Sequence, residues 1–199
     1  MKFNNGHTYT GQFIDDQAES NGQIEDKGAN IYQVQPGDNE GNTNAGTIQN
    51  ARLQNKGMIS FTNGDQFVGI FKDGRPNGYG EMMYKNSVGS TTPGLEYEMA
   101  QYKGQFRSGK REGRGKMVWA DGSCFEGNWM NDERFHGRMV MTNGCIYIGQ
   151  FREDKFHGDN EKLLMPNMAI YQGKFHMGKT GTLGMILYPN GDIYYGQHN

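Results

Sequence analysis

Two pairs of side chains that can bind zinc recur at one spacing. Cys124 and Cys145 are 21 residues apart, and so are His136 and His157, each of which lies in a Phe-His-Gly sequence. Zinc–ligand distances are about 2.0–2.3 Å, and a disulfide requires Cα atoms within about 7 Å. A shared spacing instead predicts equivalent positions in neighbouring hairpins, two strand spacings or roughly 10 Å apart. We therefore expect structural residues here, and no metal, cofactor or disulfide.

Glycine pairs such as Gly113-Arg114-Gly115 resemble the composition of phosphate-binding loops. Those loops require a strand-loop-helix context, because the helix N-terminus holds the phosphate. No ten-residue window of the chain has a helical period, and no serine stands in a Gly-x-Ser-x-Gly context. The sequence therefore predicts no nucleotide site, no catalytic residues and no enzyme activity.

A basic stretch is the best charged candidate for a binding site. Residues 103–116 contain one acid, Glu112, and six cations: Lys103, Arg107, Lys110, Arg111, Arg114 and Lys116. Each cation held near an anionic membrane contributes about 1 kcal/mol, so the stretch could bind phospholipid or an acidic protein. The alternative is a solvated face that keeps a sheet soluble. A net charge of −2 and the lack of interleaved aromatic and basic residues predict no nucleic-acid partner.

All these residues belong to a repeat that recurs along the sequence. The pattern aromatic-x-Gly-x-aromatic has its glycine at 11, 69, 104, 127, 149, 173 and 196, the last copy lacking its second aromatic residue. From Gly104 onward the glycines are 23, 22, 24 and 23 residues apart, and a worn copy at Tyr32-Gln-Val34 lies 23 residues after Gly11. Self-similarity at a fixed period is the signature of a repeat architecture.

Each repeat reads as two short strands. Two apolar residues stand ten and eight residues before most anchor glycines, as in Met117 and Trp119, and a glycine usually precedes them at minus twelve. Alternation at period two predicts strands with one buried face. Asn-Gly and Asp-Gly pairs between the strands, such as Asn143-Gly144, are strong hairpin signals. One hairpin cannot bury its aromatic face alone, so stacked neighbours must supply the core.

Composition agrees with such an array. Glycine provides 31 of 199 residues, aromatics make up 12% and hydrophobic residues 34%, which suits a sheet with one solvated face. No apolar run is long enough to span a bilayer, and the N-terminus lacks the layout of a signal peptide. With two cysteines and no export signal, a reducing cytoplasmic compartment is expected.

The repeat resembles the MORN repeat (membrane occupation and recognition nexus). The fullest match is the stretch 102–115, Tyr-Lys-Gly-Gln-Phe-Arg-Ser-Gly-Lys-Arg-Glu-Gly-Arg-Gly, and 67–80 is nearly as good. The resemblance implies an all-β fold, an elongated, twisted, single-layer antiparallel sheet of about seven to eight tandem hairpins without catalytic machinery. The chain departs from the pattern at Val34, which replaces an anchor glycine, and at Asn160, which occupies a Gly-x-Gly position.

We expect two regions and two inserts. Residues 1–56 are assigned to degenerate N-terminal repeats with a polar insert, and 57–199 to the main array with an insert at about 85–101. Inserts in repeat arrays project from one face and often carry binding specificity, although a tolerated surface loop is the alternative. The second insert offers three apolar candidates for partner contact: Leu95, Tyr97 and Met99.

The resemblance favours a structural scaffold in the cytoplasm. MORN-rich proteins without an enzyme domain are commonly cytoskeletal, and the radial spoke head proteins of motile cilia carry similar arrays. We therefore expect protein partners in an axonemal or other microtubule-associated assembly, as a homodimer or a hetero-oligomer. The aromatic ribbon offered to partners is Tyr102, Phe106, Trp119, Phe125, Trp129, Tyr147, Phe151, Tyr171 and Phe175. A phospholipid-binding module and a regulatory part of a longer kinase, as in plant phosphatidylinositol-phosphate kinases, are the alternatives.

Overall fold

The computed structural model describes residues 2, 6–10, 13–14, 17–18, 22–34, 47–49, 52–85 and 100–197. The chain divides into two compact units, Met1–Lys110 and Arg111–Asn199, here called the N-terminal and C-terminal units. All regular structure in the described ranges is β, and every strand pair in them is antiparallel. The division expected from repeat quality, 1–56 against 57–199, remains a prediction.

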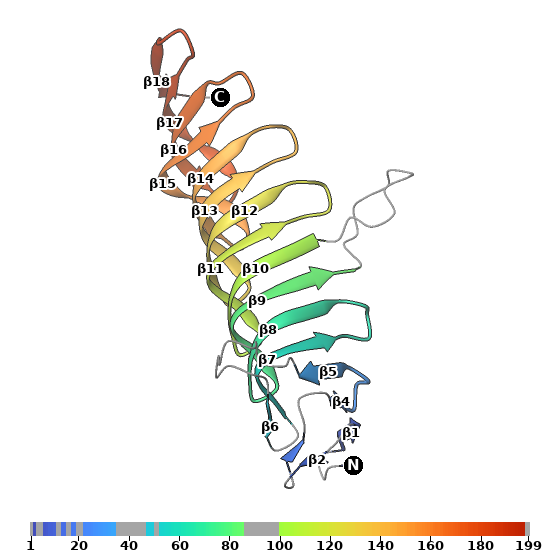
Figure 1. Ribbon diagram of the computed structural model, residues 1–199. Coiled ribbons are helices and arrows are strands. Elements are labelled where there is room, and N and C mark those ends of the chain that lie inside the picture. Colours follow the sequence, from blue (N-terminus) through green and yellow to red (C-terminus); the bar gives the residue numbers. More distant parts are fainter. Residues whose placement is uncertain are drawn as a thin grey trace, which may run out of the picture. The chain divides into compact units, whose positions relative to one another are not determined.

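The N-terminal unit is a single layer of strands (Figure 1). Its sheet has the order β1-β4-β5-β7-β8-β9-β10, with β6 also paired to β7 and β2 paired to β3 in a separate two-stranded sheet. The strands are β1 (Thr8–Thr10), β2 (Phe13–Ile14), β3 (Gln17–Ala18), β4 (Gln23–Glu25), β5 (Ile31–Val34), β6 (Thr47–Gln49), β7 (Arg52–Ser60), β8 (Gln66–Lys72), β9 (Arg75–Tyr84) and β10 (Ala100–Arg107).

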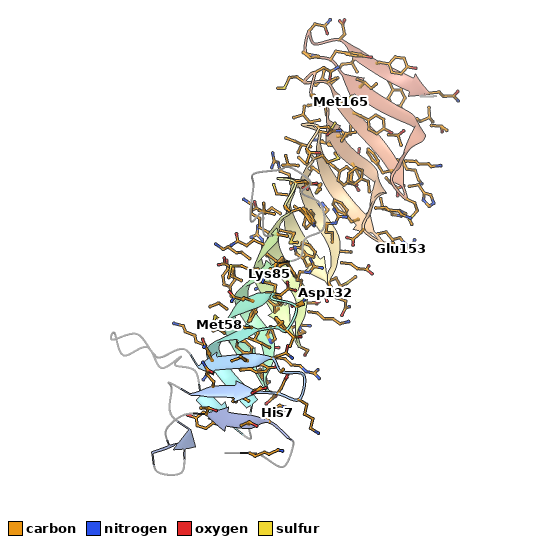
Figure 2. The ribbon with its side chains drawn as sticks, turned by 90° about the vertical axis from the view of Figure 1, so that its right-hand side faces the viewer. His7, Met58, Lys85, Asp132, Glu153 and Met165 are labelled. Atoms are coloured by element: carbon orange, nitrogen blue, oxygen red, sulfur yellow. The ribbon has the colours of Figure 1, made fainter. Side chains whose placement is uncertain are left out.

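The C-terminal unit is a regular stack of hairpins, each strand lying beside the next in chain order (Figure 1). Side chains project from both faces of the sheet (Figure 2). The strands are β11 (Lys110–Val118), β12 (Cys124–Met130), β13 (Glu133–Val140), β14 (Ile146–Arg152), β15 (Lys155–Leu164), β16 (Ile170–His176), β17 (Lys179–Leu187) and β18 (Ile193–Gln197).

A line of glycines runs across each unit. In the C-terminal unit the anchor glycine of one strand faces a glycine of the next, as in Gly115 with Gly127 and Gly127 with Gly137. A Cβ on Gly127 would lie 2.6 Å from the Gly137 Cα and 2.7 Å from the tip of the Phe125 ring. Aromatic rings therefore lie directly over the glycine line, and this approach explains the Gly-x-Gly pattern. We call the side with these rings the ring face and the opposite side the outer face.

Two kinds of turn close the hairpins. At the Asn-Gly and Asp-Gly ends, the side-chain oxygen of the Asn or Asp accepts the N–H of the residue two positions on, as Asn143 does from Cys145 at 3.0 Å. The following glycine has a positive φ, such as 82° at Gly144. At the other ends two successive residues have positive φ, as at Ser108-Gly109, which is the type I′ pattern. Both hairpin ends predicted from the sequence are confirmed.

The predicted fold class is confirmed, and the worn repeats are accommodated locally. Tyr32 and Val34 lie in β5, which pairs with β7 as a regular strand. Part of the first insert forms a short hairpin of its own, in which β6 pairs with the start of β7. In β15 the glycine line is interrupted, because Glu161 faces Gly173 where the other strands of the unit present glycine.

Candidate interaction surface

The aromatic ribbon is the core of the sheet. Eight of its nine members are between 0% and 5% exposed, and Trp119 alone is half-buried. In the C-terminal unit the rings follow one another edge to face, with centroids 5.2 Å apart between Phe125 and Trp129, Phe125 and Phe151, and Tyr147 and Phe151. Rings in this arrangement add about 0.5–1.5 kcal/mol per pair beyond their buried area. Their burial makes these rings the core of the sheet and leaves the positions around them as its exposed surface.

The tyrosines of the repeat also satisfy backbone carbonyls. Tyr102, Tyr147, Tyr171 and Tyr194 each donate their hydroxyl proton to the carbonyl three residues on, with O···O distances of 2.7–3.3 Å. Tyr147 also lies 3.1 Å from the carbonyl oxygen of His157. Burial and the Glu161 carboxylate raise the pKa of the Tyr147 phenol.

Replacing Tyr147 by phenylalanine is expected to cost about 0.5–1.5 kcal/mol of unfolding free energy, the value of a typical hydrogen bond. Phe67 and Phe125 occupy the same repeat position as Tyr147, so a phenylalanine ring fits at this position. Because folding raises this pKa above its ordinary value of about 10, the native state keeps its full stability below that pH and loses stability above it. Tyr147→Phe should therefore shift alkaline unfolding to higher pH, measured by circular dichroism against pH.

Tyr195→Phe is the matched control, because that ring is 76% exposed. It should leave the alkaline transition unchanged. Burial and the Asp26 charge raise the pKa of Tyr32 to about 12. Tyr32 therefore contributes equally to the alkaline loss of stability in both variants. If Tyr147→Phe and the unchanged chain unfold at the same alkaline pH, the raised pKa of Tyr147 is not a cause of alkaline unfolding.

Two arginines clamp neighbouring hairpins. Arg111 lies 3.1 Å from the Asp132 carboxylate, donates to the Asp132 carbonyl at 2.8 Å and stacks 4.3 Å from the centre of the Trp129 ring. Arg134 repeats the arrangement, with Asp154 at 2.8 Å and the Phe151 ring at 4.8 Å. The sequence prediction placed Arg111 in the anionic-surface group and missed Arg134. Their spacing of one repeat, 23 residues, is the signal that could have found the pair.

Arg134→Lys is expected to destabilise the C-terminal unit by about 1–2 kcal/mol, because lysine keeps the charge but loses the forked contact and the stacking. The Arg134 side chain is only 15% exposed, so water compensates little of the loss. Urea denaturation of the full chain measures the effect. Arg138→Lys, a substitution at an exposed position of the same strand, is the control and should change stability by less than about 0.5 kcal/mol.

The other predicted cations divide between the two units. In the N-terminal unit Lys103 forms an ion pair with Glu81 at 3.2 Å, and Arg107 and Lys110 are exposed. In the C-terminal unit Arg114 and Lys116 are exposed, and they face Asn128 and Glu126 across the β11–β12 ladder. Lys103 and Arg111 are thus held by acids of the chain itself. The remaining predicted residues, Leu95, Tyr97 and Met99, lie outside the described residues.

The histidines lie where the repeat spacing placed them, but the cysteines do not. In β14 the position equivalent to Cys124 is taken by Ile146, so Cys145 lies one residue before it. His136 and His157 both face Gln150 from opposite sides, so two strand spacings separate them as predicted. Cys124 and Cys145 are free thiols. Over the described ranges no group of three or more potential ligands is close enough to hold a metal ion. In those same ranges no helix is long and apolar enough to cross a membrane.

Comparison with known proteins identifies the repeat. Four stretches match the model of the MORN repeat: residues 67–87, 102–124, 147–158 and 171–193. Alsin of Mus musculus is 30% identical over 110 residues, which are 52% of this chain and 6% of alsin. Alsin of Rattus norvegicus is 27% identical over 154 residues, 62% of this chain and 9% of alsin. The matched part is therefore less than a tenth of the length of these relatives.

Solved structures give weaker likenesses. The SAS-4 TCP domain of Drosophila melanogaster, in complex with a proline-rich motif of Ana2, aligns with a TM-score of 0.48 and 9% identity, covering 89% of this chain and 83% of that one. The TCP10 domain of Danio rerio CPAP aligns with a TM-score of 0.45 and 13% identity, covering 99% and 92% of the two chains.

Proposed function

We propose that this chain, which carries MORN repeats, is a non-catalytic structural protein whose array holds other proteins in a large assembly. One observation carries the proposal. The outward position beside the anchor glycine is occupied by a different side chain in each of four successive repeats: Glu126, Ile148, Gln172 and Tyr195. The buried rings keep the scaffold constant while the outward positions vary. A regular support that displays varied side chains is how repeat proteins bind their partners.

We place this function in the cytoskeleton, with the ciliary axoneme as the specific assignment and a radial spoke or another microtubule-associated complex as the assembly. The support is the resemblance of the tandem array to MORN-rich radial spoke head proteins. A homodimer and a hetero-oligomer both suit an array of this kind. Its localisation is accordingly proposed as cytoplasmic, at the cytoskeleton of the cilium.

Binding to anionic phospholipid through residues 103–116 is the weaker candidate. Lys103 and Arg111 are engaged by Glu81 and Asp132, so the group offers fewer cations to a membrane than its sequence indicates. Electrostatic attraction to lipid headgroups is screened by salt, whereas an apolar protein contact resists salt. Salt dependence therefore separates the two candidates.

Stepwise extraction tests the proposal. The tagged chain is expressed in a ciliated cell, cilia are isolated, and they are extracted first with detergent and then with salt. We expect the chain to stay in the axoneme after the membrane is removed. Release by detergent alone would favour lipid binding, and absence from cilia would overturn the axonemal assignment. A tagged unrelated axonemal protein and a tagged ciliary membrane protein serve as the two controls.

A further inference from the structure

The outer face of the C-terminal unit carries an unbroken row of apolar side chains. At one register position all eight strands present an apolar residue, and each faces the next across the ladder. The row, here called the outer row, consists of Val118, Cys124, Val140, Ile146, Leu164, Ile170, Leu187 and Ile193. The first seven are half-buried, and Ile193 is 65% exposed.

The fold does not require apolar residues at this position. In the N-terminal unit five of the seven residues at the equivalent register are polar. The register runs through Thr8, Glu25, Ile31, Ser60, Gln66, Met83 and Gln101. The sheet there is built from the same repeat and has the same buried rings, including Phe67 at 0% exposure. The outer row is therefore a property of the C-terminal unit and not of the hairpin. A contiguous, partly exposed apolar surface of this kind marks an interaction site.

The neighbouring register position is basic. It runs through Lys116, Glu126, Arg138, Ile148 and Lys162 and continues to Gln172, Met185 and Tyr195, so three cations stand against one acid. Lys116, Arg138 and Lys162 are exposed, and within the described part of the chain none of them forms an ion pair. The outer row thus has a cationic border along its first five strands.

We propose that the outer row binds an amphipathic helix of a partner protein, with acidic residues along the side that meets Lys116, Arg138 and Lys162. Seven strand spacings of about 4.8 Å make the row about 34 Å long, which matches roughly 22 residues of α-helix at 1.5 Å each. The apolar row receives the apolar face of the helix, and the cations pair with its acidic border.

Charge disfavours a second copy of this chain as the occupant, and burial of the row disfavours a bilayer. A second copy of this chain, packed face to face, would bring a second set of the same three cations to the contact. A bilayer requires side chains that project into it, whereas seven of the eight residues are half-buried and form a shallow surface suited to the protruding side chains of a helix. The inference rests on the proposed role as a protein-binding array and adds the face and the chemistry of the partner.

The chain contains a natural reporter for this contact. Cys124 lies in the outer row, while Cys145 precedes the row residue Ile146 and lies outside the row. The probe is a synthetic 22-residue amphipathic helix, about as long as the row, with leucines on one face and glutamates beside them. Alkylation of each cysteine by iodoacetamide is followed by mass spectrometry of the intact full chain. We expect the peptide to slow alkylation of Cys124 by about tenfold or more, and that of Cys145 by much less.

Three comparisons sharpen the test. The same peptide with lysine in place of glutamate should give little protection. Arg138→Glu with Lys162→Glu should abolish protection by the acidic peptide, while Lys155→Glu with Lys179→Glu, an equal charge change at exposed hairpin ends, should preserve it. Val140→Thr with Ile170→Thr should weaken protection while keeping the β-branched shape. Circular dichroism verifies that each variant is folded.

Several results would overturn the inference. These are unchanged alkylation of Cys124 with the acidic peptide, equal protection by the lysine peptide, and protection by phosphatidylcholine–phosphatidylserine vesicles alone, which would indicate a lipid surface. Dimerisation that shields Cys124 without any peptide would assign the row to a second copy. None of these outcomes affects retention of the chain in a detergent-extracted axoneme, so the structural function is tested separately.

Discussion

Replacing Phe125 by alanine is expected to lower the free energy of unfolding by about 3–5 kcal/mol. The Phe125 ring is 0% exposed, covers the facing glycines Gly127 and Gly137, and contacts the rings of Trp129 and Phe151 edge to face. Removing it leaves a cavity in a single-layer sheet, where no second layer can move in to fill the space. Urea denaturation of the full chain, followed by circular dichroism, measures the loss.

Phe135→Ala is the matched control, since it makes the same substitution in the adjacent strand at a ring that is 47% exposed. It should cost less than about 1 kcal/mol, because little apolar area leaves a packed environment. Equal effects at Phe125 and Phe135 would show that the rings of the repeat are not the core of the sheet.

Replacing Gly127 by alanine is the second large change and should cost about 1–3 kcal/mol or more. The added Cβ would lie 2.6 Å from the Gly137 Cα and 2.7 Å from the Phe125 ring tip. The first of these neighbours is backbone, so the sheet itself must shift. We expect a lower unfolding midpoint and faster amide hydrogen exchange in β12 and β13, the strands that the two glycines join.

Gly122→Asn is the control for this substitution. Gly122 has nothing within 4 Å of an added Cβ, and asparagine tolerates its positive φ of 82° better than other residues do. The variant should therefore stay within about 1 kcal/mol of the unchanged chain. Wild-type exchange rates in the Gly127→Ala variant would mean that the glycine line is not a close-packing requirement.

Periodicity predicted the face on which the rings lie and the hairpins that carry them, but not how deeply the rings are buried. Alternation assigns a side chain to one of two faces, and it placed Tyr147 and Phe151 on the same face correctly. Alternation cannot show that two facing glycines allow an aromatic ring to pack directly against the backbone. This packing is the reason why the aromatic ribbon is buried. Burial by neighbouring repeats depends on contacts between strands that no single repeat contains.

β-Bulges explain why two identical tripeptides of the repeat occupy different environments. Phe135 and Phe156 both stand in Phe-His-Gly, yet Phe135 is 47% exposed while Phe156 stacks on Tyr147 with ring centroids 4.0 Å apart. The β12–β13 ladder shifts register between Asn128 and Trp129, so Arg134 takes the place opposite Trp129 and Phe135 has no partner across the ladder. A one-residue shift reverses the face of a side chain, and local sequence does not reveal it.

The proposed binding surface was the least predictable part of the molecule. The sequence directed attention to aromatic residues and to the cations of 103–116, because these are the types that dominate interfaces. The outer row became visible only when the ladder brought Val118 to Cys124 and onward to Ile193. Each of these residues stands next to one of the aromatic or apolar residues that define the repeat. Their alignment in one row depends on how the strands pair, which the repeat period alone does not give.

Cross-linking mass spectrometry of the native assembly tests the structural function most directly. The tagged chain is purified from cells after detergent extraction, cross-linked through its lysines and digested. We predict that it co-purifies with other proteins and that Lys116 and Lys162, on the outer face, cross-link to them. A chain that purifies alone after detergent, with every cross-link internal, would contradict the proposal that this array holds proteins together.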